Sequence, residues 1–345
     1  MPQQEISFMK ALHHWFKKNQ RPFPWREERT PYKVWISEVM LQQTRASVVV
    51  PYFLRWMERF PDVEILASAS LEEVIKAWEG LGYYSRARNL HKGAKQIVSE
   101  FNGKIPDTEK DLDAISGLGP YTIGAILSFG FQKKAAAVDG NVARVISRYC
   151  AIKENIGKSK VRKKIEQKAL ELSDAKEPWI TAEALIELGA TVCLPKPRCN
   201  DCPLHASCSG LKEGIAESLP VKNGEKEITL LTRVVAVIEC RGQILVRKGE
   251  AGKIMADLYE FPYLDGASIS STVLEKWLGF NVEFIQNLPE VVHSFTRYKA
   301  RLLPRFFKTE TPRLNEKHEW VSRKRLLDLP FSAGHRKIAK QLSRA

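Results

Sequence analysis

Several features that mark other classes of protein are absent from this chain of 345 residues. No apolar run approaches the length of a membrane-spanning helix, and residues 1–15 lack the charged-then-apolar layout of a secretory signal. The chain also contains no internal repeats and no low-complexity tracts. We therefore expect a cytoplasmic, nucleoid-associated protein with no membrane partner.

Cysteine is scarce and unevenly placed. Only six cysteines occur; four of them lie between Cys193 and Cys208, whereas Cys150 and Cys240 stand alone. A disulfide framework is typical of short secreted chains with cysteines spread along them, so this distribution favours a metal site instead.

Acidic residues are outnumbered by basic ones. The chain has 54 Lys and Arg against 40 Asp and Glu, which gives a formal net charge of +14. Such a charge favours a polyanionic partner, because each contact with a phosphate releases counterions. Charge alone does not separate nucleic acid from an acidic membrane surface or from simple solubility.

Length and composition predict two domains, since a hydrophobic share of 44% allows proper cores. The first part has helical periodicity, and we expect helices at 5–18, 32–44, 46–59, 71–79, 85–101, 108–115, 141–150, 159–173 and 178–190. Residues 211–228 are polar and contain glycine and proline, which indicates a linker. The following part has short apolar runs, and those on either side of Arg241-Gly242 predict a β-hairpin in a small mixed α/β domain.

The segment 115–148 carries the strongest local signals. Gly117-Leu118-Gly119-Pro120 forms a tight turn before an apolar helical run, and the N–H groups at the start of such a helix suit an anion. Asp139 lies further on in an apolar stretch. It is either an ordinary helix N-cap or a functional carboxylate; the turn, the clustered cysteines and the basic charge favour the second interpretation.

The four clustered cysteines have the spacing C-x5-C-x2-C-x5-C. Thiolates bind soft metals, and one compact loop of four can surround a single centre. Zinc is the general alternative, but its usual form is two separated C-x-x-C pairs. The spacing therefore favours an iron–sulfur cluster over zinc.

Together these residues resemble the helix-hairpin-helix DNA glycosylases that carry an iron–sulfur loop, and among them the adenine DNA glycosylase (MutY) family. The segments that carry the resemblance are 24–26, 37–44, 80–90, 117–122, 138–142, 187–190 and 193–208. The resemblance implies an all-helical glycosylase domain over 1–210, a linker over 211–228 and a Nudix-like α/β domain over 229–345. It also implies a 4Fe-4S cluster bound by Cys193, Cys199, Cys202 and Cys208.

The implied reaction is hydrolysis of the N-glycosidic bond of adenine mispaired with 8-oxoguanine or guanine in duplex DNA. This reaction needs an acid that protonates the departing adenine and a carboxylate that stabilises the sugar cation. Glu38 fits the acid, because its neighbours one helical turn away are mostly apolar and should raise its pKa. The alternative for Glu38 is an exposed helix glutamate. Asp139 fits the second carboxylate.

Three further residues acquire roles from the resemblance. Related enzymes with lyase activity have a lysine just after the hairpin, whereas this chain has Tyr121, so no amine is available there for a Schiff base. The resemblance thus implies a monofunctional enzyme in which Tyr121 places the sugar. It also implies that Asn141 supports Asp139 and the attacking water, and that Glu183 lines the adenine pocket.

The target base must leave the helical stack before it can react. Gln43, with Leu41, resembles the wedge that fills the gap, although Leu41 has simple core packing as an equal alternative. Tyr83 resembles the residue that intercalates beside the oxidised guanine. Further DNA contacts are expected at Trp25, Arg26, Thr44, Arg86, Arg88, Lys92, Gly117 and Gly119. The basic run at 158–164 has two interpretations, contact with phosphates or a solvated helix face, and the second is favoured.

The chain departs from the family pattern in its second part. Segment 270–279 contains one glutamate, Glu275, where a catalytic Nudix helix needs several to hold magnesium, so this domain is expected to recognise rather than catalyse. The family's Phe-Ser-His loop, which reads 8-oxoguanine, is best matched by Phe295, Thr296 and Arg297, where arginine brings a permanent charge and a longer reach. The first cysteine gap has five residues where the family usually has six.

We expect a monomer that binds duplex DNA with A:8-oxoguanine or A:G mispairs. Two other functions stay open: a bifunctional glycosylase/lyase that acts on oxidised pyrimidines, and an iron–sulfur DNA damage sensor without catalysis. The presence of both Glu38 and Asp139 favours an enzyme over the sensor.

Overall fold

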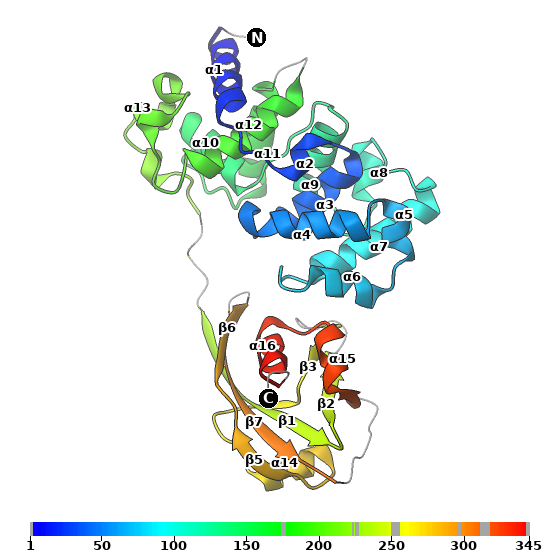
Figure 1. The fold of residues 1–345 in the computed structure, drawn as a ribbon. Coiled ribbons are helices and arrows are strands. Elements are labelled where there is room, and N and C mark those ends of the chain that lie inside the picture. The colour runs from blue at the N-terminus through cyan, green and yellow to red at the C-terminus, as the bar shows by residue number, and fades with distance from the viewer. Residues whose placement is uncertain are drawn as a thin grey trace. The chain divides into compact units, whose positions relative to one another are not determined.

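The structure is a computed structural model that describes residues 3–173, 177–222, 224, 228–249, 256–295, 298–310 and 318–342. The chain divides into two compact units: one comprises Met1–Ser68 and Asn89–Gly224, and the other Ala69–Arg88 and Glu225–Ala345. The first is helical and the second contains a mixed sheet, which confirms the predicted fold class (Figure 1). No helix that the structure describes combines the length and apolar character needed to cross a membrane.

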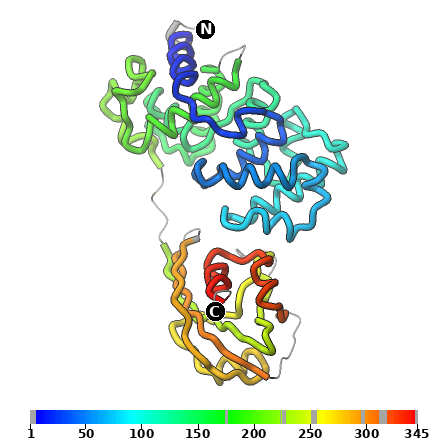
Figure 2. Tube along the Cα trace, viewed as in Figure 1, coloured from blue at the N-terminus to red at the C-terminus, as the bar shows by residue number. Residues whose placement is uncertain are grey.

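The first unit is built from helices joined by short turns. They are α1 (Gln3–Asn19), α2 (Pro24–Glu27), α3 (Pro31–Leu41), α4 (Ala46–Arg59), α5 (Val63–Ser68), α7 (Ser85–Phe101), α8 (Glu109–Asp113), α9 (Pro120–Ala125), α10 (Gly140–Tyr149), α11 (Ser159–Glu171), α12 (Pro178–Thr191) and α13 (Ser209–Lys212). A π-helical turn, Ile126–Gly130, continues α9. The N-terminal α1 packs on α12, far along the chain (Figure 2). Leu12 of α1, Val145 of α10 and Leu188 of α12 lie in one buried core.

Local sequence explains where the helices that shape the site begin. Thr30 accepts a hydrogen bond from the N–H of Lys33, and Pro31 occupies the first position of α3, where proline costs no hydrogen bond. Pro24 likewise starts the short α2, which the sequence analysis did not predict. Asp139 caps α10. The predicted helices are confirmed with end shifts of a few residues, and α5 was not predicted.

The helical hairpin lies between α8 and α9. Gly117 has a φ of +84°, and a Cβ there would stand 2.4 Å from the Cβ of Asn89. Glycine is therefore required at this position for both conformation and space. Gly119 has an ordinary φ of −108° and open space where its side chain would be. Backbone conformation and packing thus require glycine at position 117, whereas neither constraint applies at position 119.

The second unit contains α6 (Leu71–Trp78) and an eight-stranded sheet. The central path runs β3-β2-β1-β7-β5; β4 pairs with β1, β6 with β7 and β8 with β2. The strands are β1 (Thr229–Cys240), β2 (Gln243–Lys248), β3 (Tyr259–Glu260), β4 (Tyr263–Asp265), β5 (Glu283–Asn287), β6 (Val291–Phe295), β7 (Tyr298–Lys308) and β8 (His318–Ser322). The long strands β1 and β7 are parallel.

Both faces of this sheet are covered, which explains why β1 is a continuous apolar run. Val235 and Val237 pack on one face with α16 (Ala333–Leu342), whereas Ala236 and Ile238 pack on the other with α14 (Ser271–Leu278). A short helix, α15 (Arg323–Asp328), precedes α16. The predicted β1–β2 hairpin is confirmed, and its turn residues Arg241 and Gly242 both have positive φ.

Candidate active site

A cavity of about 880 Å³ opens in the first unit. Its walls come from α2, α3 and the turn after it, α9, α10 and α12, which are far apart in sequence. The cavity brings together most of the residues predicted for catalysis and base binding. They are Trp25, Arg26, Glu38, Leu41, Gln43, Thr44, Tyr121, Asp139, Asn141 and Glu183.

Glu38 projects from α3, a helix that is buried over most of its length. The side chain is 7% exposed, and its Oε2 accepts a hydrogen bond from the hydroxyl of Tyr121. Burial raises the pKa of Glu38 to about 7, and the negative charge of nearby Asp139 adds to the rise. The raised pKa that the apolar helix face predicts is thus found, and the exposed-helix alternative is wrong.

Asp139 is both an N-cap and a cavity residue. Its Oδ1 accepts hydrogen bonds of 2.8 Å from the N–H groups of Asn141 and Val142, and its Oδ2 accepts one of 2.7 Å from the Asn141 amide. Burial raises the pKa of Asp139, although these hydrogen bonds oppose the rise. The two interpretations of Asp139 from sequence therefore describe one arrangement, because the cap fixes the carboxylate at the cavity wall.

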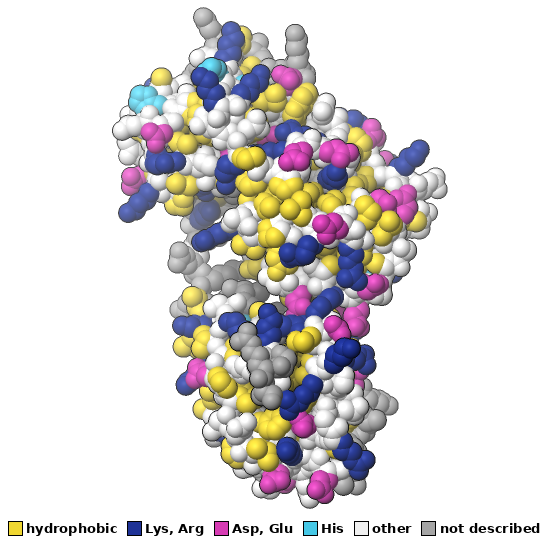
Figure 3. Space-filling model, in the orientation of Figure 1, with side chains coloured by type: hydrophobic (Ala, Val, Ile, Leu, Met, Phe, Trp, Pro, Cys, Tyr) yellow, Lys and Arg dark blue, Asp and Glu magenta, His cyan; other side chains and the backbone are white. Residues whose placement is uncertain are grey.

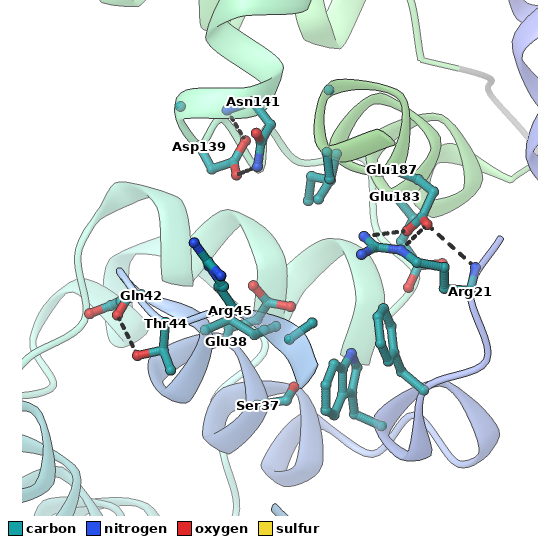
Figure 4. Close-up of a pocket in the computed structure, with 18 of the residues that line it drawn as sticks. Arg21, Ser37, Glu38, Gln42, Thr44, Arg45, Asp139, Asn141, Glu183 and Glu187 are labelled. Carbon is teal, nitrogen blue, oxygen red and sulfur yellow. Dashed lines mark hydrogen bonds and ion pairs between the residues drawn. The ribbon is translucent and has the colours of Figure 1, made fainter. Parts of the chain in front are cut away.

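Glu38 and Asp139 face each other across the cavity. Figure 4 shows Glu38 and Arg45 on the wall of α3 and its following turn, opposite Asp139 and Asn141 at the start of α10. One carboxyl group holds its proton near neutral pH, while the other accepts three hydrogen bonds. Such a pair can supply a proton to a leaving group from one side and stabilise positive charge from the other.

A buried ionic network forms another wall. Glu187 on α12 accepts a hydrogen bond of 2.5 Å from Nε of Arg21 and one of 2.9 Å from Nη2 of Arg26. Burial alone would raise the pKa of Glu187, but these two arginines outweigh it and lower the pKa. Glu183, one turn earlier, lies 2.9 Å from Nη2 of Arg29. Burial raises its pKa despite the nearby arginines.

The sequence analysis missed Arg21, Arg29 and Arg45 at this site, and it named Glu187 only within the segment 187–190. Arg29 shares a carboxylate with the predicted Arg26, since Glu183 lies 3.9 Å from the latter. A second arginine three residues after a predicted one was the only available signal. The pairing itself depends on α2 meeting α12 in the folded chain.

The turn after α3 carries the predicted wedge. Gln43 is exposed, has a φ of +57° and lines the cavity together with Leu41 and Thr44. A positive φ at a residue other than glycine costs energy and is held by its surroundings. The amide of Gln42 donates to Thr122 Oγ1 at 3.2 Å, which ties this turn to the helix after the hairpin. Leu41 is half-buried, so it combines packing with a place at the cavity.

The four clustered cysteines line one small cavity with Arg148 and His205. The five-residue gap therefore does not keep Cys193 and Cys199 apart. Burial raises the pKa of Cys202 to about 12, and the other thiols add to the rise. Among the residues that the structure describes, no group of three or more His, Cys, Asp or Glu side chains is arranged to hold a metal ion. The four thiols share this cavity, and thiolates are the ligands that soft metals prefer, so the chemistry of the donor set fits a soft-metal centre.

Arg148 fixes the cysteine loop from inside the protein. The side chain is 2% exposed and donates to the carbonyls of Leu219 at 2.9 Å, Leu194 at 2.5 Å and Pro195 at 2.8 Å. Its Nη1 also lies 3.4 Å from Sγ of Cys193. A permanent positive charge at this place would balance thiolates gathered around a metal.

Arg144 connects the cysteine loop to the catalytic wall. Its guanidinium donates to the carbonyl of Cys193 at 2.7 Å, to Oδ1 of Asn141 at 2.9 Å and to the carbonyl of Gly189 at 2.8 Å. Gly189 makes the approach possible, because a Cβ there would stand 2.6 Å from Asn141 Cβ. The sequence indicates this bridge only by the helical spacing of Arg144 from Asn141.

The remaining predicted residues do not line the cavity. Tyr83 lies in the turn after α6 and Arg86 in the first turn of α7, both within the second unit, and Phe295 ends β6. Thr296 and Arg297 lie outside the described residues. Gly117 and Gly119 form the hairpin turn. On the face in Figure 3, Lys and Arg side chains lie scattered among Asp and Glu, so this face does not locate the polyanion site that net charge predicts.

Comparison with known proteins covers both parts of the chain. Residues 36–170 match the family described as HhH-GPD superfamily base excision DNA repair protein, and residues 233–341 match the NUDIX domain. An adenine DNA glycosylase of Buchnera aphidicola (strain Sg) is 34% identical, with 86% of each chain covered. One from Rattus norvegicus is 41% identical over 66% of this chain and 46% of its own length. A solved thermostable thymine-DNA glycosylase is 27% identical, with a TM-score of 0.56 over 61% of this chain and 97% of its own.

Proposed function

Because this chain belongs to the adenine DNA glycosylase family, we propose that it is a base-excision-repair enzyme that hydrolyses the N-glycosidic bond of adenine mispaired with 8-oxoguanine or guanine in duplex DNA. The observation that carries the proposal is the pair of facing carboxyl groups in one cavity. Glu38 has a pKa of about 7, and Asp139 is held by three hydrogen bonds. A purine leaving group needs this combination of acid and charge stabilisation.

In this mechanism Glu38 donates its proton to a ring nitrogen of the flipped adenine. The bond between C1′ of the sugar and the base nitrogen then breaks, and its electron pair leaves with the neutral adenine. The carboxylate of Asp139 stabilises the positive charge that develops on the sugar. Water adds its oxygen to C1′ and gives up a proton to Asp139, which leaves an abasic sugar in an intact strand.

The ionic network of α2 and α12 serves base binding in this proposal. Glu183 and Glu187 are acceptors, while Arg26 and Arg29 present donors along the same wall. Adenine has both an amino donor and ring acceptors, so a wall of paired charges can satisfy both edges. Gln43 and Leu41 occupy the turn from which a wedge would enter the space that the flipped base vacates.

We propose that the enzyme is monofunctional. A lyase forms a Schiff base from a lysine close to C1′. None of the residues that line the described cavity is a lysine, and Tyr121 stands where the lyases carry one. Tyr121 instead donates to Glu38, and burial raises the pKa of its own hydroxyl well above 10. A neutral tyrosine places the acid without attacking the sugar.

We also propose a 4Fe-4S cluster bound by Cys193, Cys199, Cys202 and Cys208. The support is their shared cavity, together with the charge and the hydrogen bonds that Arg148 supplies around it. When bound, such a cluster would fix the loop between α12 and α13. Arg144 would then help to fix Asn141, since its guanidinium donates hydrogen bonds both to the carbonyl of Cys193 in this loop and to Oδ1 of Asn141.

The test compares Glu38→Gln with the wild-type protein and with Glu28→Gln as a control. Glu28 is an exposed glutamate, 71% accessible and paired with Lys33, just before the same helix. Free adenine released from an A:8-oxoguanine duplex is measured in single-turnover reactions, and duplex binding is measured alongside. We expect Glu38→Gln to lose at least roughly a hundredfold in rate while it retains binding, and Glu28→Gln to match the wild type. Near-normal adenine release by Glu38→Gln would refute the assignment.

A further inference from the structure

The turn that joins α6 to α7 presents an exposed aromatic side chain on an unusual backbone. Gly80, Gly82 and Tyr83 all have positive φ, and Tyr83 is 40% exposed. Inside the turn, the indole N–H of Trp78 and the guanidinium of Arg86 both donate to the carbonyl of Gly82, at 3.0 Å each. The hydrogen bonds to the Gly82 carbonyl thus fix the backbone next to Tyr83, whose side chain is exposed.

This turn is anchored to the sheet-containing part of the second unit by an ion pair. Arg336 on α16 donates from Nε to Oε1 of Glu79 at 2.5 Å and from Nη2 to Oε2 at 2.9 Å, so both carboxylate oxygens are engaged. The two side chains are only 13% and 16% exposed. The N–H of Phe331 donates to the same carboxylate at 3.3 Å. A two-pronged, partly buried pair of this kind fixes direction as well as distance.

Arg336 is itself rigidly placed. Its guanidinium donates to the carbonyls of Leu326 at 3.1 Å and Leu327 at 3.2 Å, and also to the carbonyl of Leu329. Lys76, on the last turn of α6, donates to the same Leu327 carbonyl at 2.7 Å and to Oε2 of Glu79 at 3.0 Å. The end of α15 is therefore joined to the start of the Tyr83 turn through several bonds that share acceptors.

The other end of the turn has its own anchor. Nη1 of Arg88 donates to the carbonyl of Ala256 at 3.0 Å and lies 3.5 Å from the carboxylate of Asp257. Asp257 has a φ of +62°, which indicates that its backbone is held in place. Glu79 and Arg88 thus tie down both ends of the turn, and Tyr83 lies between them.

From this arrangement we propose that Glu79 and Arg336 are positioning residues for lesion reading: they let the Nudix-like fold set the direction in which Tyr83 enters DNA. The inference rests on the proposed function, in which Tyr83 lies beside the base opposite adenine. It predicts that the Nudix-like fold contributes to discrimination through the turn 79–88 as well as through its own loops. The residues act through Tyr83 and do not touch the reacting atoms.

The test uses the full-length protein with four variants: Arg336→Met, Glu79→Gln, the double variant, and Arg323→Met as a control. Arg323 also forms an ion pair within the second unit, with Glu239 on β1, but that pair does not reach the turn. Hydrogen exchange of the peptide 79–88 is measured without DNA, and thermal unfolding is recorded for each variant. Adenine release is then compared for duplexes with 8-oxoguanine and with guanine opposite adenine.

We expect Arg336→Met and Glu79→Gln each to accelerate exchange over 79–88 and to lower the preference for 8-oxoguanine by roughly tenfold. The double variant should show the same exchange rate and the same preference as either single variant, because each single change already breaks the ion pair. Arg323→Met should leave both quantities unchanged. If Arg336→Met does not fold, Glu79→Gln carries the test alone, since it keeps Arg336 and its bonds to α15.

Two results would overturn the inference. Unchanged exchange over 79–88 would show that the ion pair does not hold the turn, whatever the activity. Faster exchange over 79–88 with an unchanged preference for 8-oxoguanine would show that the ion pair holds the turn, but that the position of the turn does not affect discrimination between the two bases. If the wild-type protein released no adenine, the proposed function would fall, whereas the exchange measurement would still decide whether Glu79 and Arg336 hold the turn.

Discussion

Burial turns Glu38 from an ordinary glutamate into an acid for neutral pH. Its pKa rises to about 7 from 4.5 chiefly through loss of water, although the hydrogen bond from Tyr121 opposes the change. Asp139 also has a raised pKa, but its three hydrogen bonds favour the ionised form. The two carboxyl groups of the cavity thus have different immediate partners: Glu38 accepts one hydrogen bond, whereas Asp139 accepts three that favour its ionised form.

These shifts fix the pH dependence of adenine release. Glu38 must carry a proton, so the single-turnover rate should fall as pH rises through about 7. Asp139 must be ionised, so the rate should also fall at low pH, in a range above that of an ordinary aspartate because its pKa is raised. We expect a bell-shaped profile, measured with A:8-oxoguanine duplexes at constant ionic strength. A rate that continued to rise well above pH 7 would contradict the role of Glu38 as the acid.

Individual site residues differ in how far sequence could predict them. Glu38 and Asp139 stand in local patterns, an apolar helix face and a glycine-containing stretch, and the structure places both at the cavity. Arg29 and Arg144 have no such pattern. Their partners, Glu183 and the carbonyl of Cys193, come from α12 and from the loop after it, so only the folded chain brings them together.

At the scale of elements, the two glycines of the helical hairpin have different roles. Gly117 needs its positive φ and has no room for a Cβ beside Asn89, whereas Gly119 has neither constraint. Gly119 caps the start of α9 and has open space where a side chain would be. A phosphate can therefore come close to the N–H groups at this helix start.

Alanine substitutions should therefore have different effects at the two glycines. Gly117→Ala should destabilise the first unit by about 1–3 kcal/mol, seen in urea unfolding, because φ and packing both oppose it. Gly119→Ala should leave unfolding unchanged but weaken duplex binding, measured by fluorescence anisotropy. Equal loss of stability in both variants would refute the distinction.

Arg144 gives the second prediction for an element. Arg144→Met removes the donors that connect Asn141, Gly189 and the cysteine loop, so the start of α10 should lose its fixed position. Adenine release should slow by roughly tenfold or more, and Arg144→Lys should recover part of the rate. Arg162→Met on α11 is the control. An unchanged rate for Arg144→Met, with full iron content, would show that the bridge does not position Asn141.

The helices and the β1–β2 hairpin were predictable because periodicity and turn residues are local signals. The grouping of α6 and the Tyr83 turn with the sheet-containing part was not predictable. It depends on pairs such as Lys76 with Leu327, which are 251 residues apart. The short helices α2, α5 and α13 were not predicted either, because four or six residues show too little of a helical period.

For the whole molecule, the chain combines a helical unit that contains the cavity with a unit that joins the Tyr83 turn to a Nudix-like sheet. Its segment 270–279 contains a single glutamate, Glu275, whose Oε1 accepts the N–H of Val282 at 3.0 Å. That carboxylate thus joins α14 to the segment that follows it. We propose that this unit recognises the lesion while the helical unit performs the chemistry.

The most direct test of the account is cleavage of labelled duplexes that carry adenine opposite 8-oxoguanine, guanine or thymine, analysed with and without alkali. We predict strand breaks at adenine only after alkali, strongest opposite 8-oxoguanine, weaker opposite guanine and weakest opposite thymine. Breaks without alkali would instead indicate a lyase. No adenine release from any duplex, by a protein that still binds mismatches and contains iron, would contradict the central claim that Glu38 and Asp139 form an adenine-hydrolysing site.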